Sequence, residues 1–176
     1  LNQGKGYAIR TGCLSAQGDL ILIADADMST PWEEFFKLAK PVLNNQYQIS
    51  IASRSVKSSQ ISTRQPWYRE SMGKIFNLIL RTLTGLPFKD TQCGFKLMKR
   101  KATKSVWPTL KVNRFAWDVE FLMISSLYQC QTCEVGVVWN HKDESRVHPI
   151  KDSFEMLMSV LKIRIRILLG HYFIKS

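Results

Sequence analysis

Residues 18–34, GDLILIADADMSTPWEE, constrain the fold of this chain more than any other stretch. Residues 20–24 form an unbroken apolar run, and its short length after a Gly-Asp pair predicts a strand buried on both faces. Asp25 and Asp27 follow, and alternation along an extended chain predicts both carboxylates on one side. Because open α/β sheets bind ligands at the carboxyl ends of their strands, the stretch predicts an α/β fold with a ligand site there.

The paired carboxylates predict a metal site, since two like charges held close together repel each other unless a cation lies between them. Mg²⁺ and Mn²⁺ prefer carboxylate oxygens and can bring a phosphate group with them, so either ion suits Asp25 and Asp27. Ser29 and Thr30 are then expected to cap a helix that follows. The alternative is that both aspartates serve only as turn residues between a strand and a helix.

The composition indicates a folded domain with an anionic partner. The 176 residues suffice for one domain with a core, and 45% of them are hydrophobic. The net charge of +11 favours nucleic acid, an acidic membrane surface or phosphorylated substrates. No apolar stretch approaches the roughly 20 residues that span a bilayer. The first residues lack the apolar core of a signal peptide and an initiator methionine, so we expect an upstream part to be missing.

Several cationic side chains are expected near the predicted site. Gly4-Lys5-Gly6 lies at the start of a helix predicted at residues 2–17. Backbone amides at such a helix start can approach an anion, and the lysine adds positive charge. The alternative is a plain helix-entry turn. Arg54 directly follows a strand predicted at residues 48–53, which places it at the same sheet edge as the two aspartates.

Further candidates lie later in the chain. Arg69 is near the start of a helix predicted at residues 67–84, and Arg146 lies in a polar loop at residues 140–149. Asp90 and Gln92 belong to a loop before a short strand, where three hydrogen-bonding side chains stand close to a glycine. That concentration favours a functional loop, and the alternative is an Asx-type turn.

A basic amphipathic helix is predicted at residues 152–170. Lys162, Arg164 and Arg166 alternate there with apolar residues, which suits a helix lying in a membrane interface with its basic side chains at the head groups. The alternative is a helix packed on its own domain.

The motifs together resemble those of family 2 glycosyltransferases. They are, in order, GKGYAIRTG, DADMSTP, IASR, DTQCGFKLMKR, FAWDVEFL and VVWNHKDESRV, and they are most similar to the dolichyl-phosphate and polyprenyl-phosphate branch. The resemblance implies a GT-A fold, a nucleotide-sugar-binding α/β sandwich, without its N-terminal strands. Residues 1–150 would then be the C-terminal part of the catalytic domain, and residues 151–176 the membrane-interface helix.

The resemblance also implies a reaction. Glucose would move from UDP-glucose to dolichyl or polyprenyl phosphate, with inversion and with Mg²⁺ or Mn²⁺, in a membrane-associated protein on the cytoplasmic face. That membrane would be the endoplasmic reticulum in a eukaryote or the plasma membrane in a prokaryote. Transfer of mannose from GDP-mannose is an alternative, although Ser29 replaces a glutamine that helps to hold the metal in that branch.

Residue roles follow from the resemblance and are assigned by position. Asp25 and Asp27 would bind the metal ion. The residues that would bind the nucleotide sugar are Gly4, Lys5, Gly6, Asp25 and Arg146. The residues that would bind the acceptor phosphate are Arg54, Arg69 and Gln92, and Asp90 would be the catalytic base or a group that only orients the phosphate.

Three other classes of protein are alternatives to this one. A phosphatase of the haloacid dehalogenase class needs an acidic pair downstream, and no two adjacent aspartates follow Asp27. A nucleic-acid-binding module would explain the positive charge, but no known binding motif occurs, and paired carboxylates do not suit a phosphate-binding face. We therefore expect no nucleic acid partner. A non-catalytic fragment acting as a scaffold stays open.

Overall fold

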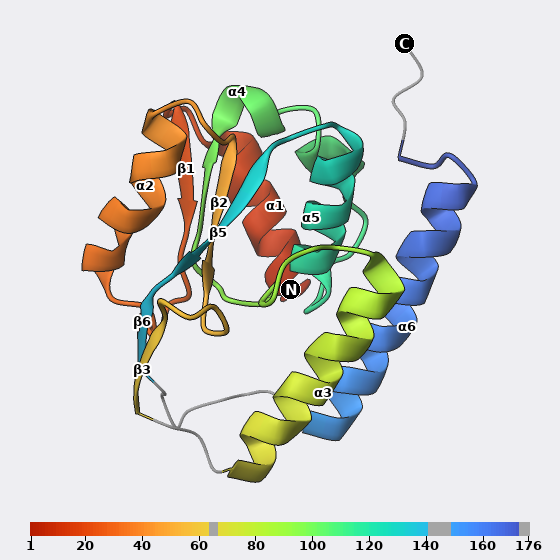
Figure 1. Cartoon of the computed structure of the whole chain (residues 1–176). Helices are drawn as coiled ribbons and strands as arrows, with labels where there is room; N and C mark the ends of the chain where they lie inside the picture. The colour runs from red at the N-terminus through yellow and green to blue at the C-terminus, as the bar shows by residue number, and fades with distance from the viewer. Residues whose placement is uncertain (64–66, 141–148, 173–176) are drawn as a thin grey trace.

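The computed structural model describes residues 1–63, 67–140 and 149–172, which form an α/β body with two long helices beside it (Figure 1). The body is built on a four-stranded sheet, in the order β1 (Leu20–Ile23), β4 (Lys96–Lys99), β2 (Ile49–Ser53) and β5 (Thr132–Gly136). β4 runs antiparallel to β1 and β2, whereas β2 and β5 are parallel. The predicted α/β class is therefore confirmed, and β1, β2 and β5 all end at one edge of the sheet.

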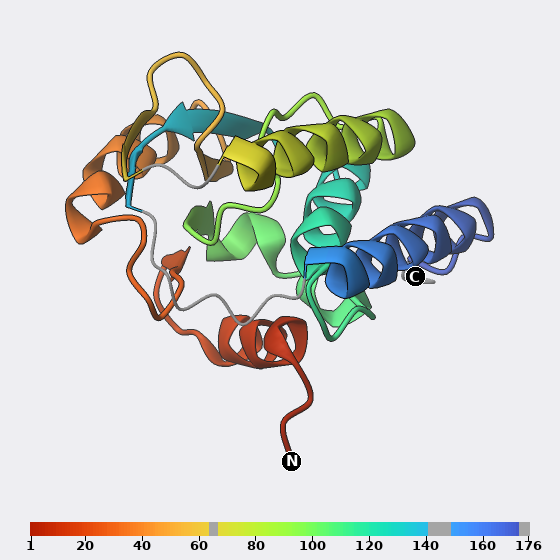
Figure 2. The ribbon, with the colours of Figure 1, turned by 90° about the horizontal axis from the view of Figure 1, so that it is seen from below.

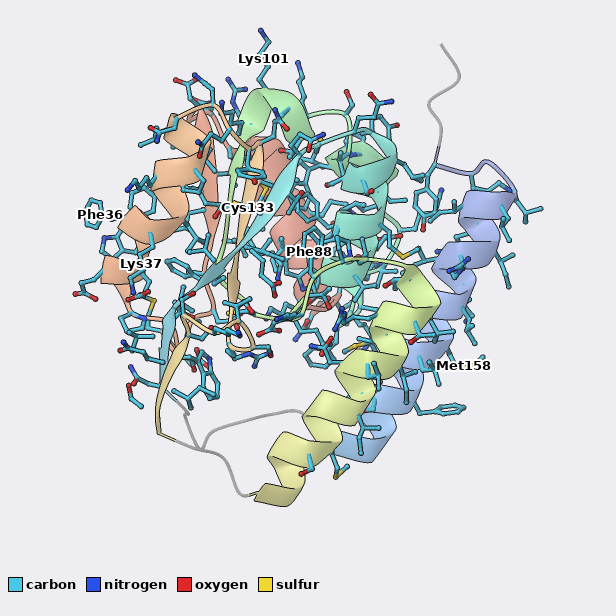
Figure 3. The ribbon with its side chains drawn as sticks, viewed as in Figure 1. Phe36, Lys37, Phe88, Lys101, Cys133 and Met158 are labelled. Carbon is cyan, nitrogen blue, oxygen red and sulfur yellow. The ribbon has the colours of Figure 1, made fainter. Side chains whose placement is uncertain are left out.

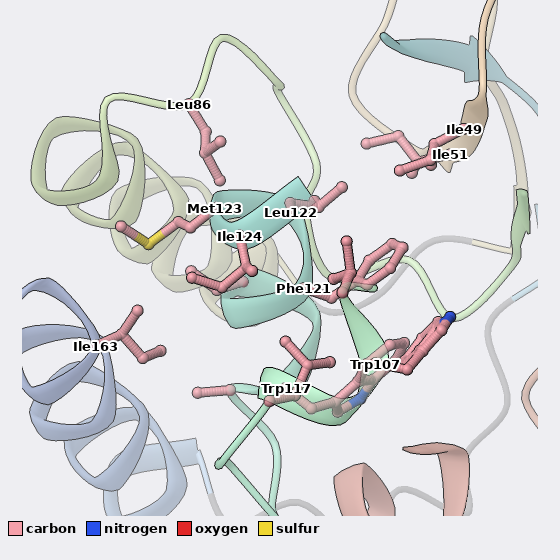
Figure 4. Packing of buried hydrophobic residues seen from close by; sticks show 14 of the residues in the cluster. Ile49, Ile51, Leu86, Trp107, Trp117, Phe121, Leu122, Met123, Ile124 and Ile163 are labelled. Atoms are coloured by element: carbon pink, nitrogen blue, oxygen red, sulfur yellow. The ribbon is translucent and has the colours of Figure 1, made fainter. Parts of the chain in front are cut away.

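Helices cover both faces of this sheet. One face packs against α2 (Phe35–Leu43), which continues through Pro41 without a break. The other face packs against α1 (Lys5–Ser15) and α5 (Trp117–Leu127), and α5 is buried along most of its length. The rings of Trp107 and Phe121 stack in this second core with their centroids 4.6 Å apart (Figure 4). The result is a three-layer sandwich whose two cores are separated by the sheet.

The two long helices, α3 (Trp67–Thr84) and α6 (Pro149–Leu168), lie outside this sandwich and contact each other (Figure 1, Figure 2). α6 also contacts α5 and buries Val160 and Ile163 completely. Nevertheless, both helices leave large apolar side chains in solvent: Met72, Ile75, Leu78 and Ile79 on α3, and Phe154, Met158, Leu161, Ile165 and Leu168 on α6. Within the described ranges, no helix has the length and apolar character needed to cross a membrane.

Shorter elements complete the described chain. The 3₁₀ turns η1 (Trp32–Glu34) and η2 (Trp107–Thr109) and the short helix α4 (Arg100–Thr103) connect the layers. A second, two-stranded sheet pairs β3 (Gln60–Thr63) with β6 (Val138–Asn140) in parallel.

One strand prediction needs correction. The strand predicted at residues 20–24 ends at Ile23, and it buries only alternate side chains, because β1 is the outer strand of the described sheet and has a neighbour on one side only. β5 and β6 are separate strands, since the chain leaves the main sheet after Gly136 and pairs with β3. The helix predicted at residues 67–84 has the bounds of α3.

Candidate active site

Three segments meet at the edge of the sheet where β1 and β2 end. Asp25 follows β1, and Arg54 follows β2. Because β4 is antiparallel to both, the loop that precedes it, residues 88–95, begins the strand at this same edge. The directions of the strands therefore bring these three segments together, as expected. Their side chains form two separate centres, each of which contains an aspartate.

The first centre contains the two aspartates after β1. The chain turns here instead of continuing as a strand: the Met28 amide donates to the Asp25 carbonyl at 3.0 Å, and Met28 has φ +51°. The expectation that strand alternation aligns both carboxylates is therefore wrong, because no extended backbone links them. Asp27 Oδ1 accepts the Ser29 amide at 2.9 Å, as in an Asx turn.

The predicted caps are also wrong. Ser29 and Thr30 are buried, and η1 starts after Pro31 without a side-chain capping bond. Thr30 Oγ1 instead lies 3.8 Å from Cys93 Sγ, on the loop before β4. These two side chains therefore attach the aspartate turn to that loop.

Lys5 joins the glycine motif to the aspartate turn. Its Nζ lies 2.5 Å from Asp25 Oδ1, and both side chains are about one-third exposed. Gly94 closes the other side of the same carboxylate, since a Cβ on Gly94 would fall 1.9 Å from Asp25 Oδ2. Asp25 therefore lies between an ammonium group and a backbone that only glycine provides.

The glycines on either side of Lys5 have a packing role that the sequence did not indicate. Gly4 has φ +104°, and a Cβ there would approach the Asn113 carbonyl oxygen to 2.4 Å. A Cβ on Gly6 would lie 2.6 Å from the Val112 carbonyl oxygen. Both positions need glycine because α1 begins directly against residues 112–114, so the predicted contact of these glycines with a nucleotide sugar stays a prediction.

The second centre is an ion pair between Arg54 and Asp90. Arg54 Nε donates to Asp90 Oδ2 at 2.7 Å, Nη2 donates to Oδ1 at 2.9 Å, and the Arg54 amide donates to Oδ2 at 3.0 Å. Asp90 is 1% exposed, and burial alone would raise the pKa of its carboxyl group. The Arg54 charge outweighs that effect and lowers the pKa of Asp90 to about 2. The Arg54 side chain is about one-third exposed, and its guanidinium carbon lies 5.5 Å from the centroid of the Trp139 ring.

Neighbouring elements hold the Asp90 loop in place. Glu134 on β5 accepts the backbone amides of Lys89 and Asp90 at 2.9 and 2.7 Å. Asn77 on α3 donates to the Lys89 carbonyl at 2.5 Å, and the Gln92 side chain donates to Met156 Sδ on α6 at 2.7 Å. The loop is therefore attached to the sheet on one side and to both long helices on the other.

Two buried charged side chains, those of Lys96 and Asp118, were not among the predicted site residues. Lys96 on β4 has no exposed surface, and Asp118 at the start of α5 is 5% exposed. Burial lowers the pKa of Lys96 and raises the pKa of Asp118, and each group's charge opposes the shift of the other. The signal for Lys96 was a lysine inside the apolar segment FKLM, whereas Asp118 lies in the first turn of α5, where the helix dipole also favours an acidic residue.

The described residues contain no cluster of three or more histidine, cysteine, aspartate or glutamate side chains that could hold a metal ion. Two hard carboxylates are nevertheless the protein ligands that Mg²⁺ typically uses when substrate phosphates complete its shell. The ammonium group on Asp25 indicates that this carboxylate takes a cation, so the donor set fits such an ion. Arg146 lies outside the described residues, as does the side chain of Arg69.

Comparison with known families gives a consistent result. The model of the family described as Glycosyl transferase family 2 matches residues 1–107. The chain is 34% identical over 179 residues to the dolichyl-phosphate beta-glucosyltransferase of Dictyostelium discoideum, and 34% identical over 174 residues to that of Homo sapiens. These matches cover 99% and 96% of the chain but 55% and 54% of the relatives. The chain therefore spans about half the length of the curated relatives it matches.

Solved structures show the same fold at low sequence identity. Glucosyl-3-phosphoglycerate synthase from Mycobacterium tuberculosis, in complex with Mn²⁺, UDP-glucose and glycerol 3-phosphate, gives a TM-score of 0.60 at 18% identity, over 98% of this chain and 56% of that one. Mannosyl-3-phosphoglycerate synthase from Rubrobacter xylanophilus gives 0.60 at 17% identity, over 99% and 54%. These likenesses confirm the GT-A fold that the sequence resemblance implied.

Proposed function

The chain belongs to glycosyltransferase family 2, and we propose that the protein transfers glucose from UDP-glucose to dolichyl phosphate or a similar polyprenyl phosphate. The observation that carries this proposal is the pair of centres at one sheet edge, Lys5–Asp25 and Arg54–Asp90. One offers carboxylates to a cation, and the other offers a guanidinium to a phosphate. A transfer between two anionic substrates needs both, since the cations hold the substrates together against their repulsion.

The aspartate turn is the proposed site of the nucleotide sugar. Asp25 and Asp27 would hold Mg²⁺ or Mn²⁺, which neutralises the departing diphosphate when it is bound. Lys5 lies beside this carboxylate, and its ammonium would contact the diphosphate. Mn²⁺ with UDP-glucose in a structure of the same fold supports this arrangement. We place Gly4, Gly6 and Arg146 on the same substrate by resemblance.

The Arg54–Asp90 centre is the proposed site of the acceptor phosphate, together with Arg69 and Gln92. A phosphate monoester has a second pKa of about 6, so the attacking oxygen is largely ionised at neutral pH and needs little help from a base. Asp90 has a pKa of about 2 and is bonded to a guanidinium, which makes it a weak proton acceptor. We therefore assign Asp90 to orienting Arg54, and Arg54 to binding the phosphate.

The helices α3 and α6 are the proposed membrane contact. Both expose rows of apolar side chains, and α6 adds Lys162, Arg164 and Arg166, a combination that suits an interface with anionic lipid. Met158, on the α6 surface, is one of these side chains (Figure 3). Asn77 and Met156 connect the two helices to the Asp90 loop, so a lipid phosphate at this surface lies next to Arg54. We place this contact at the cytoplasmic face.

The test is a transfer assay on the protein in its natural length. Detergent micelles containing dolichyl phosphate, Mn²⁺ and radiolabelled UDP-glucose should yield label in the lipid fraction, and omission of the lipid or the metal should abolish it. GDP-mannose in place of UDP-glucose tests the mannosyl alternative. Binding of UDP-glucose without any lipid product would favour the scaffold alternative and contradict the proposed activity.

A further inference from the structure

A buried lysine on β4 is bonded to the loop between the two centres. Lys96 has an exposed fraction of 0%, and it lies opposite Ile23 of β1 and Ile51 of β2 in the sheet. Its Nζ is 5.3 Å from the centroid of the Trp117 ring on α5. Taking an amine out of water into such an apolar layer opposes folding, so an apolar residue would suit this position better unless the amine has a specific task.

The contacts of Lys96 indicate that task. Its Nζ donates to the Cys93 carbonyl at 2.5 Å, and this carbonyl belongs to the peptide group that joins Cys93 to Gly94. Gly94 in turn lies against the Asp25 carboxylate, so closely that a Cβ would fall 1.9 Å from Oδ2. The lysine therefore fixes the peptide that supports one side of Asp25.

A second buried charge, Asp118, lies in the first turn of α5. Burial lowers the pKa of Lys96, and the Asp118 charge is the largest influence that opposes this shift. Asp118 Oδ1 accepts the amide of Val119 on its own helix, at 2.8 Å. Lys96 and Asp118 are thus two buried groups of opposite charge, and Asp118 is bonded to the backbone of α5.

We propose that Lys96 is a positioning residue for the cation site: through the Cys93 carbonyl it holds Gly94 against Asp25, and so sets where that carboxylate can receive a divalent cation and diphosphate. This rests on the proposed function, because it assigns Asp25 to that cation. Groups that orient metal ligands from behind typically change metal affinity by about 10- to 100-fold when they are replaced.

The experiment measures Mn²⁺ binding directly, by the electron paramagnetic resonance signal of free Mn²⁺, in the presence of UDP and in the natural-length protein. Lys96→Met removes the donor with little change of shape, and Gly94→Ala pushes on Asp25 from the same side. Lys99→Met is the matched control, since Lys99 lies on the same strand and its side chain bonds Asn45 near the surface. Lys96→Met with Asp118→Asn removes both buried charges, in case the first variant does not fold.

We expect Lys96→Met and Gly94→Ala each to raise the Mn²⁺ dissociation constant about 10-fold or more, and the two together to raise it no further than the larger single effect. Lys99→Met should bind as the wild type does. Wild-type affinity in a folded Lys96→Met protein would overturn the inference, as would loss of folding in both Lys96 variants, which would make Lys96 a core residue only. Absence of Mn²⁺ binding in the wild type would instead contradict the proposed function.

Discussion

The two acidic centres differ in how much of their bonding capacity the protein itself uses. Asp90 is 1% exposed and accepts bonds from the Arg54 side chain, the Arg54 amide and the Gln92 amide. The Asp25 side chain is 34% exposed, and its carboxylate is bonded to Lys5 alone among the contacts described. A carboxylate has about four acceptor positions, so Asp90 is nearly saturated, whereas Asp25 keeps positions open to a ligand. The saturated centre positions a cationic side chain, and the open one is suited to receive a cation.

The centres also face different parts of the molecule. The Asp90 loop bonds to α3 and α6, the helices with the exposed apolar rows, whereas Asp25 bonds to α1. This separation matches the two substrates that we propose, a lipid phosphate at a membrane surface and a nucleotide sugar from solution.

The largest effect is expected from removing charge at the open centre. Asp25→Asn or Asp27→Asn in the natural-length protein should abolish transfer, a loss of several kcal/mol of transition-state stabilisation, because the cation would lose its carboxylates. Far-UV circular dichroism and urea unfolding should match those of the wild type. Metal-dependent turnover that survives in either variant would remove the metal assignment.

At the saturated centre, removing the aspartate charge should lower the stability of the fold. Asp90→Asn leaves Arg54 without its counter-charge, and breaking a buried pair in this way lowers the free energy of unfolding by about 3 kcal/mol. Asp27→Asn, at an exposed turn, should change it by about 0.5 kcal/mol or less. Urea denaturation of both variants measures the contrast, and equal losses would show that the two centres do not differ as described.

The membrane contact should depend on the basic residues of the long helix. Replacing each with glutamine should weaken binding to anionic liposomes by about 1 kcal/mol, and less at high salt; the residues are Lys162, Arg164 and Arg166. Co-sedimentation measures this, with Lys101→Gln and Lys104→Gln beside α4 as the control, since Lys101 lies on the side of the body away from α3 and α6 (Figure 3). Unchanged binding, or unfolding of the variant, would mean that α6 is a core element and the membrane contact lies elsewhere.

Acid should weaken the saturated centre at a defined pH. The pKa of Asp90 is lowered from its ordinary 3.8 to about 2, so its ionised form stabilises the fold above pH 3.8, and this stability is lost as the pH falls towards 2. Urea unfolding of the wild type and Asp90→Asn should therefore show a difference at pH 6 that shrinks by about 2 kcal/mol towards pH 2. A difference that stays constant with pH would contradict the ion pair.

Much of the fold was predictable because local patterns determine it. The apolar spacing of residues 67–84 gives the bounds of α3, and the apolar runs before Asp25 and Arg54 give two strands that end at one edge. The turn after β1 was misjudged because strand alternation was extended beyond the last paired residue, Ile23.

The pairing within the site could not be predicted. Arg54 and Asp90 are 36 residues apart in sequence, and they meet only because an antiparallel β4 brings its preceding loop to the end of β2. Glu134 and Lys96 were overlooked because a charge within an apolar segment is usually assigned to the solvent face. In this fold Lys96 is buried and bonded to a backbone carbonyl, whereas Glu134 is partly buried and accepts backbone amides.

The division of substrates between the two centres is the central claim, and Arg54→Ala tests it most directly. Initial rates with dolichyl phosphate varied, in the natural-length protein, give the lipid KM, and calorimetry gives the dissociation constant for UDP-glucose. The account predicts that loss of the guanidinium impairs use of the lipid phosphate by about 1.5–3 kcal/mol, with the dissociation constant for UDP-glucose unchanged. A raised dissociation constant for UDP-glucose with an unchanged lipid KM would contradict it and reverse the two centres.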